Sequence, residues 1–140
     1  MDFNYIKWYW LRTVLLFCLT CIVLVNNALA GNYQSSVALP VIHSKGYLYT
    51  ADLPVSRHAP SAATVSNVSW NWSVVGWPQG LEVYICHASG ACLDISRQRV
   101  GSTARFSKVL ASRKFYYALR VGNAGRVPLA GQLGHITVNW

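Results

Sequence analysis

Acidic side chains are scarce in this chain of 140 residues. Four Asp and Glu stand against twelve Lys and Arg, a formal net charge of +8, and charged residues make up only 11% of the sequence. So few carboxylates leave little room for catalysis by paired acids. The low charge and an aromatic content of 13% exclude a disordered tail. No run of about 18 apolar residues occurs, which excludes a helical membrane bundle, and the length favours one domain.

Motifs of the common enzyme classes are also absent. The chain has no G-x-S-x-G, H-E-x-x-H or G-x-x-x-x-G-K-[ST] pattern, and no C-x-x-C pair of a thioredoxin-like site. A Ser/His/Asp triad assembled from distant positions remains an alternative, because triads are recognised by geometry and not by order. The sequence therefore favours a protein that is not an enzyme and that uses no cofactor or metal.

The first thirty residues have the three parts of a secretory signal peptide. Lys7 and Arg12 supply a positive start, an apolar stretch of thirteen residues runs from Thr13 to Val25, and Ala28-Leu29-Ala30 gives an A-x-A cleavage pattern. The stretch is shorter than the roughly 20 residues of an anchor helix. We expect cleavage after Ala30 and an exported mature domain of residues 31–140.

Lipoprotein processing is a second interpretation of this segment, since Cys18 and Cys21 lie in it. A lipidation site has a small residue before the cysteine, whereas Phe and Thr precede these two, so we set this interpretation aside. Both cysteines then leave with the leader. The predicted mature chain keeps two cysteines, Cys86 and Cys92.

Alternation of apolar and polar residues dominates the rest of the chain. In residues 67–74, Val68, Trp70, Trp72 and Val74 alternate with polar side chains, which is typical of a strand that buries one face. The same period of two occurs over residues 81–85, 115–121 and 135–140, and shorter candidate strands lie at 37–42, 47–53, 92–97, 103–109 and 126–130.

Gly, Pro and Asn residues separate these candidate strands and favour turns, and residues 56–66 are predicted to be a surface loop. No stretch of ten residues shows a clear helical period. About nine short strands at regular spacing predict an all-β fold. We expect a small, single-domain antiparallel β-sandwich.

The two remaining cysteines flank a five-residue turn, HASGA. Cys86 falls on the strand face opposite Val83 and Ile85, and Cys92 on the face opposite Leu93, so both thiols point the same way. An even pair in an exported domain indicates one hairpin disulfide. Zinc is the weaker alternative, because it needs four ligands and usually a C-x2–4-C spacing.

Basic residues concentrate between residues 97 and 126, a stretch that contains no acid. Such a segment attracts anionic lipid head groups or an acidic protein surface, whereas export argues against nucleic acid as the partner. The alternative is that dispersed cations only keep a β-protein soluble.

Each tryptophan could likewise be either a partner-binding residue or a core residue. Trp77 lies in a Gly-Trp-Pro turn and is predicted to be exposed, whereas Trp70, Trp72 and Trp140 are in phase with core positions. The candidate partner-binding residues are therefore Arg97, Arg99, Arg105, Lys108, Arg113, Lys114, Arg120, Arg126 and Trp77.

Over residues 66–140 the chain resembles the flagellar protein FlhE family, through the order and spacing of several motifs. These are Trp70-Asn71-Trp72, Gly76…Pro78…Gly80-Leu81-x-Val83, Cys86…Cys92, Gly101-Ser102-Thr103…Phe106, Val121-Gly122…Gly125-Arg126-Val127-Pro128 and Val138-Asn139-Trp140.

The resemblance implies a periplasmic, non-enzymatic β-domain, with an Ig-like or pilus-chaperone-like sandwich, made alongside the flagellar type III export apparatus. It further implies a role in limiting proton leakage through the export gate, in support of flagellar assembly and motility. The implied partner is the gate or another flagellar protein. The alternatives are a periplasmic chaperone that pairs an edge strand with a secreted client, an anionic membrane surface as partner, and a homodimer.

Overall fold

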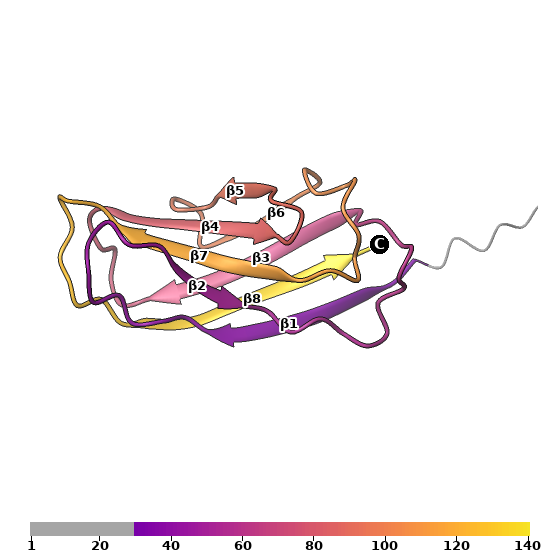
Figure 1. Cartoon of the computed structure of the whole chain (residues 1–140), viewed down its shortest axis with the longest axis horizontal. Coiled ribbons are helices and arrows are strands. Elements are labelled where there is room, and N and C mark those ends of the chain that lie inside the picture. Colours follow the sequence, from indigo (N-terminus) through magenta and orange to yellow (C-terminus); the bar gives the residue numbers. More distant parts are fainter. Residues whose placement is uncertain (1–29) are drawn as a thin grey trace, which may run out of the picture.

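Two antiparallel sheets of four strands pack face to face in the computed structural model, which describes residues 30–140 (Figure 1). The predicted leader, apart from Ala30, lies outside the described residues. The strands are β1 (Asn32–Ala38), β2 (Tyr49–Asp52), β3 (Asn67–Val74), β4 (Leu81–His87), β5 (Cys92–Asp94), β6 (Val100–Thr103), β7 (Phe115–Val121) and β8 (Gly131–Asn139). The predicted all-β sandwich is confirmed, with eight strands in the described residues where about nine were expected.

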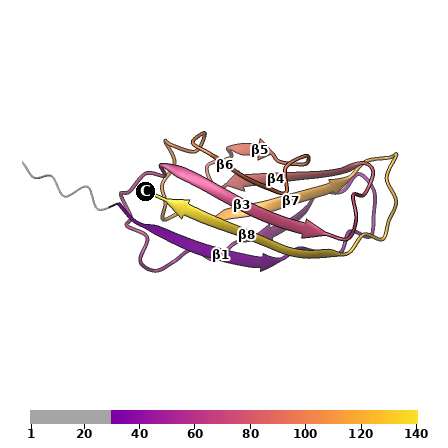
Figure 2. The same ribbon diagram turned by 180° about the vertical axis from the view of Figure 1, so that it is seen from behind.

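The first sheet has the order β1-β8-β3-β6 and the second the order β2-β7-β4-β5. Figure 2 shows β1, β8 and β3 side by side in the first sheet. The chain enters and leaves at the same end, where Gly31 and Trp140 exchange two backbone hydrogen bonds of 3.0 and 2.9 Å. Both sheets therefore have open edge strands, β1 and β6 in one sheet and β2 and β5 in the other.

The alternating pattern of residues 67–74 forms β3 as predicted, and its four apolar side chains are all buried. On the facing sheet, β7 buries Phe115, Tyr117, Leu119 and Val121. Alternating strands of this kind give each sheet one apolar face, and the two faces form the core between them.

Tyr117 connects the two sheets by a hydrogen bond through the core. Its hydroxyl on β7 donates to the carbonyl oxygen of His135 on β8 at 2.8 Å. The ring lies so close to Gly134 that an added Cβ would sit 2.5 Å from it. Glycine is required here because the backbone of β8 and the tyrosine ring share one space.

The chain changes sheet between β5 and β6. Trp70 and Trp72 both donate their indole Nε1–H groups to the carbonyl oxygen of Gln98 in this connection, each at 2.9 Å. The two indoles, buried at one edge of the sandwich, thus have their single polar groups satisfied. The crossing segment is thereby fixed against β3.

The predicted disulfide is present and joins Cys86 to Cys92, with an S–S distance of 2.04 Å. The two residues are direct partners in the β4–β5 hairpin. Side chains on paired residues leave a hairpin on the same face, which is why the sequence register predicted the bridge correctly.

Three of the shorter candidate strands were placed wrongly. Of the candidate strand 103–109, only Thr103 is extended, as the last residue of β6. Residues 104–109 turn, with Ser107 N–H donating to the Ala104 carbonyl, and Phe106 enters the core. Residues 126–130 contribute only a single bridge, between Leu129 and Ile42. The first strand lies at 32–38 and not at 37–42.

The alternation of apolar and polar residues did not reveal the first strand, because its inward face is partly polar. Tyr33 and Ser35 both point inward and are buried. The Ser35 hydroxyl donates to the Pro54 carbonyl oxygen at 2.7 Å, and this bond offsets the loss of water around a buried hydroxyl. The alternation of β1 is therefore visible only once its tertiary partner is known.

Candidate functional site

The connections between strands gather at two opposite ends of the sandwich (Figure 1). We call one the Trp77 end, which consists of the connections 39–48, 75–80 and 122–130 together with the first three residues of β8, 131–133, on the left in Figure 1. We call the other the His87 end, which consists of residues 53–66, 87–92 and 104–114. The candidate partner-binding residues divide between these two ends.

The basic stretch therefore does not form one continuous surface. Four of its cations belong to the His87 end: Arg105, Lys108, Arg113 and Lys114. Arg126 belongs to the Trp77 end, and Arg99 and Arg97 lie beside it, in the β5–β6 connection. Arg120 lies near the end of β7.

Backbone contacts join the three segments of the Trp77 end. Gly122 N–H donates to the Gly80 carbonyl and Gly46 N–H to the Val121 carbonyl, both at 2.8 Å. The Lys45 ammonium donates to the Asn123 carbonyl at 3.1 Å. Gly80 has a φ of 73°, and an added Cβ would sit 3.0 Å from the Gly125 nitrogen, so this crossing of two turns requires glycine.

The exposed ring of Trp77 stacks on the side chain of Arg99. The Arg99 guanidinium carbon lies 3.9 Å from the centroid of the Trp77 ring and 5.3 Å from that of Trp72. The same guanidinium donates to the carbonyl oxygens of Val74 and Gly76, which fixes the turn that carries Trp77. Stacking of this kind contributes about 1 kcal/mol at a partly exposed site.

The predicted exposure of Trp77 is confirmed, because 70% of the residue is accessible to solvent. One face of its ring rests on Arg99. Trp72, the second ring near the guanidinium, is 1% exposed and belongs to the core. Arg99 therefore links a buried indole to an exposed one. Its guanidinium interacts with these two rings and with two backbone carbonyls of the protein itself.

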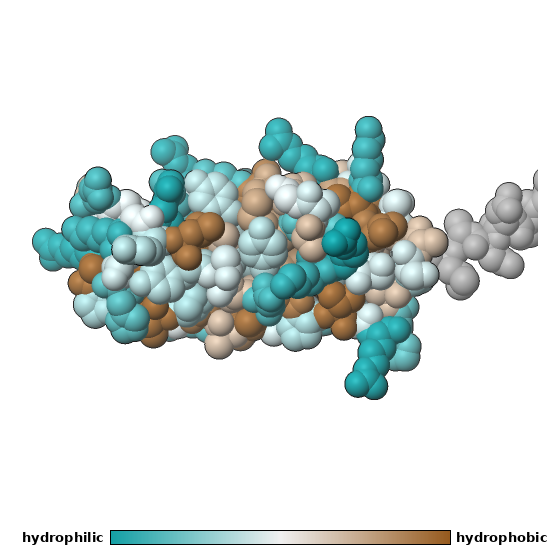
Figure 3. All heavy atoms as spheres, in the orientation of Figure 1, coloured by the Kyte–Doolittle hydropathy of each residue, from teal (hydrophilic) through white to brown (hydrophobic). Residues whose placement is uncertain are grey.

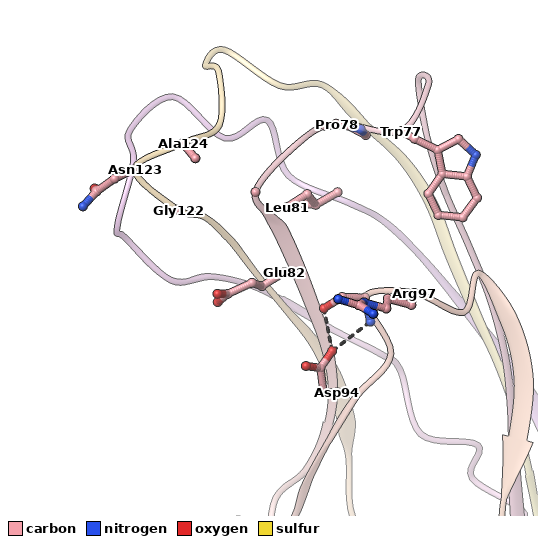
Figure 4. A pocket seen from close by; sticks show the side chains of 11 residues that line it. Trp77, Pro78, Leu81, Glu82, Asp94, Arg97, Gly122, Asn123 and Ala124 are labelled. Carbon is pink, nitrogen blue, oxygen red and sulfur yellow. Dashed lines mark hydrogen bonds between the residues drawn. The ribbon is translucent and has the colours of Figure 1, made fainter.

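A hollow with a volume of about 580 Å³ lies beside this turn (Figure 4). Its lining includes Trp77, Leu81, Glu82, Asp94 and Arg97. In Figure 4 the Trp77 ring lies at one border of the hollow, and Asn123 lies on the opposite side. The hollow is open to solvent and has both apolar and charged walls.

Both carboxylates of the hollow have partners within the protein. Glu82 Oε2 accepts hydrogen bonds from Arg120 at 2.8 Å and 2.5 Å. Asp94 Oδ1 accepts from the backbone N–H of Ser96 at 2.9 Å and from its hydroxyl at 2.5 Å. In residues 30–140 no three His, Cys, Asp or Glu side chains gather as metal ligands would. The hollow thus offers a surface for binding, while its two carboxylates form hydrogen bonds within the protein.

At the opposite end, the imidazole of His87 is buried, with 1% of the residue exposed. Its Nε2 lies 3.1 Å from the Leu110 carbonyl oxygen, and its Nδ1 accepts a hydrogen bond from Ser89 N–H at 3.1 Å. A carbonyl needs a donor and an N–H needs an acceptor, so these contacts select the neutral imidazole with its proton on Nε2. Burial lowers the pKa of His87, and the charge of Arg113 acts in the same direction.

Sequence reasoning did not single out His87 as a structural element. The residue follows Cys86 at the end of β4, where both side chains are buried and the period of two breaks down. The only sequence signal was its place beside a disulfide cysteine. Its role became visible through Phe115, whose ring packs against the imidazole with centroids 4.8 Å apart.

Among the cations of the His87 end, Lys114 has an acidic partner. Its ammonium lies 2.6 Å from the Asp52 carboxylate, and the two side chains are 50% and 59% exposed. Arg105, Lys108 and Arg113 are exposed. These three residues therefore contribute most of the positive charge that this end shows to solvent.

Comparison with known protein families identifies one that this chain matches. The family model described as flagellar protein FlhE matches residues 40–140, which is more than half of the chain. The chain belongs to the FlhE family. The matched region holds the whole His87 end and nearly all of the Trp77 end, and begins after β1.

The FlhE fold is also seen in a solved structure. The structure described as "Crystal Structure of FLHE" matches with a TM-score of 0.69 at 23% sequence identity. The match covers 79% of this chain and 96% of that chain, and it shows a shared fold. Among curated proteins, none matches the chain.

Residues 30–140 contain no helix that is long and apolar enough to cross a membrane. Their distinctive features are surfaces: a stacked and exposed tryptophan, a hollow and two groups of cations. These features fit binding better than chemistry, and the family is that of a flagellar protein.

Proposed function

We propose that this chain is a periplasmic accessory protein of the flagellar type III export apparatus. It limits proton leakage through the export gate and so supports flagellar assembly and motility. The family match over residues 40–140 carries this proposal. A protein that docks over a proton-conducting opening lowers the flow because it displaces the water through which protons move.

The disulfide supports the proposed location. Disulfides persist in oxidising compartments such as the bacterial periplasm and are rare in the cytosol. Cys86 and Cys92 are paired at 2.04 Å in a hairpin, the arrangement expected of a structural bridge. Together with the expected cleavage of residues 1–30, this favours a chain that matures beyond the inner membrane.

The cations of the His87 end support docking on an acidic surface. Arg105, Lys108 and Arg113 are exposed, and the acid of this region, Asp52, pairs with Lys114. A local excess of positive charge speeds encounter with an acidic partner and loses effect as salt rises. Lys114 is a poor residue for a charge-reversal test, because Lys114→Glu would also place a carboxylate beside Asp52.

Deletion of the gene in a flagellated bacterium tests the proposal. Cytoplasmic pH, followed while flagella assemble, is expected to fall faster than in the parent strain in acidic medium, and swimming to be impaired. Expression of the wild-type chain restores both. Unchanged pH together with normal swimming would contradict the proposal.

A charge reversal sharpens this test. The double variant Arg105→Glu and Arg113→Glu is expected to restore pH and swimming poorly. Its difference from the wild type should shrink as the salt concentration rises, because salt screens the attraction in the wild type and the repulsion in the variant. Arg97→Glu, an equally exposed arginine outside the His87 end, is the matched control and is expected to complement. Equal complementation by both variants would remove the cations of the His87 end from the docking surface.

The edge strands support a second candidate, a periplasmic chaperone that adds a client segment to its sheet. β1 pairs with β8 on one side only, is seven residues long and contains no charged residue, a composition that leaves an edge open to pairing. Pro54 contacts this strand through the inward-facing hydroxyl of Ser35. A photo-crosslinker at Gln34 distinguishes the candidates, since capture of flagellar or pilus axial subunits would favour the chaperone and capture of a gate component the accessory role.

A further inference from the structure

Exposed apolar side chains concentrate at the Trp77 end. Of the eight large apolar residues that are exposed in residues 30–140, only Val100 and Leu110 lie elsewhere. The six at the Trp77 end have exposed fractions of 42% to 70%, and they are Val41, Tyr47, Leu48, Val75, Trp77 and Leu133. Exposed apolar surface gathered at one end of a small protein indicates an interaction site.

The same end carries cations and no acid. None of the segments 39–48, 75–80 and 122–133 contains an Asp or Glu, while Lys45 and Arg126 are exposed there. The acids beside the hollow, Glu82 and Asp94, lie further along the strands, and Glu82 is paired with Arg120. A partner that meets this end therefore meets apolar side chains surrounded by positive charge.

Five of these apolar residues come from the connections of this end, and Leu133 comes from the beginning of β8. The connections lie at one end of the molecule's long axis (Figure 1). On the face shown in Figure 3, brown apolar patches are small and separated by polar side chains, and long hydrophilic side chains project from both ends. Protein interfaces usually have a continuous, closely fitted apolar core. A fluid lipid surface needs no such fit, since it adapts to dispersed side chains.

We propose that the Trp77 end docks on a bilayer that contains anionic phospholipid. Trp77 and Tyr47 lie at the level of the head groups, where amphipathic aromatic rings are favoured, and Lys45 and Arg126 lie against the lipid phosphates. Arg99 holds the Trp77 ring in place before contact, so little side-chain freedom is lost on docking. The sandwich then stands on the membrane with its long axis upright and its His87 end directed away.

This inference adds a membrane contact to the proposed function and rests on it only for the compartment in which the membrane is met. The two can fail separately. Vesicle binding is measured with purified protein, whereas proton leakage is measured in cells. Loss of vesicle binding with an intact effect on cytoplasmic pH would remove the membrane contact alone.

Flotation with lipid vesicles tests the inference. The protein is purified without detergent from the soluble fraction of cells that express the full chain. It is then mixed with vesicles of phosphatidylcholine alone or with one third phosphatidylglycerol. We expect at least tenfold stronger partitioning into the anionic vesicles, with a steep loss as salt rises from 50 to 500 mM.

Variants locate the contact. The double variant Tyr47→Ser and Trp77→Ser is expected to lower partitioning about tenfold. The double variant Lys45→Gln and Arg126→Gln is expected to lower it about 25-fold, since each cation near an anionic surface strengthens binding about fivefold. Val100→Ser is the matched control, because Val100 is as exposed as Trp77 but lies on β6. It is expected to bind like the wild type, and far-UV circular dichroism checks that all variants are folded.

Two results would overturn the inference. The first is wild-type protein that does not float with anionic vesicles, and the second is flotation that both double variants leave unchanged. A photo-crosslinker at Gln79 in intact cells then asks whether a protein covers this end instead. Capture of one specific protein, without vesicle binding in vitro, would assign the Trp77 end to that partner.

Discussion

The two ends of the sandwich are both built from three strand connections, but their side chains are used differently. At the His87 end, aromatic rings turn inward: Phe106 and Phe115 pack edge to face with centroids 5.2 Å apart, and His87 packs on Phe115. The neighbouring disulfide closes the hairpin of this end. At the Trp77 end, Trp77 and Tyr47 point outward.

The two ends therefore have different roles: the side chains of the His87 end stabilise the fold, and those of the Trp77 end are available to bind a partner. Side chains that fill the core lower the free energy of the fold and are hidden from any partner. Exposed apolar side chains contribute little to the fold and are available for binding. We therefore expect mutations at the His87 end to change stability and mutations at the Trp77 end to change binding.

The largest expected effect comes from truncating a buried ring at the His87 end. Phe115→Ala is expected to lower the free energy of unfolding by about 3–5 kcal/mol, because the side chain is fully buried and leaves a cavity between Phe106 and His87. Trp77→Ala, the larger truncation at the other end, is expected to cost about 1 kcal/mol or less. Urea unfolding followed by circular dichroism measures both. Equal losses of unfolding free energy in the two variants would contradict the different roles of the two ends.

Removal of the disulfide has the next largest effect. Changing Cys86 and Cys92 together to Ser is expected to lower the free energy of unfolding by about 2 kcal/mol, since a bridge across so short a turn restricts the unfolded chain only modestly. Unfolding of the wild type in the presence of a reducing agent should reproduce the loss. The distant turn of Trp77 should not respond, so a change in the near-UV signal on removal of the disulfide that disappears in a Trp77→Phe background would argue that the two ends are coupled.

A pH dependence that originates at one end is expected from His87. The pKa of His87 is lower in the fold than in the unfolded chain, where it lies near 6.5. The unfolded chain therefore takes up a proton first as pH falls, so this residue's contribution is complete above pH 6.5 and declines below it. Protonation removes the acceptor of Ser89 N–H, a hydrogen bond that contributes about 1 kcal/mol.

Urea unfolding at pH 7.5 and pH 5 measures this decline, with His87→Gln as the comparison. The variant is expected to be less stable at pH 7.5 and to lose less between the two pH values. His43, an exposed histidine of the Trp77 end, gives the matched control His43→Gln, which should behave like the wild type. An identical decline in His87→Gln would place the titrating group elsewhere.

The smallest effect is expected from the exposed ion pair of the His87 end. Lys114→Gln removes the partner of Asp52, and an exposed pair of this kind contributes about 0–1 kcal/mol. The loss should shrink further in 500 mM salt. Thermal unfolding at two salt concentrations measures it. A loss above about 2 kcal/mol would show that this pair is part of the core structure of the end.

The strands with strict alternation could be predicted from the sequence because each buries an apolar face. Residues 67–74 and 115–121 became β3 and β7 with the predicted bounds. β1 could not be predicted, because Ser35 is buried only through its bond to the Pro54 carbonyl, 19 residues away. Phe106 was assigned to a strand because local order does not reveal that a turn can also deliver a ring to the core.

The candidate site was foreseen in part. The exposure of Trp77 followed from its place in a Gly-Pro turn, and its stacking on Arg99 did not, since the two residues lie on different connections. The basic stretch suggested one positive surface. The fold divides it between two ends, because β7 carries the chain from Lys114 at one end of the sandwich to the connection that holds Arg126 at the other.

The sequence by itself determined the all-β sandwich, the hairpin disulfide and the family, because periodicity, cysteine register and motif order are local properties of the chain. The tertiary structure alone decided which exposed residues are neighbours. Tyr47, Trp77 and Arg126 belong to three different connections, and they share one end because backbone hydrogen bonds between Gly46, Gly80 and the β7–β8 connection hold those segments together. A surface assembled from distant segments has no signature in the order of residues.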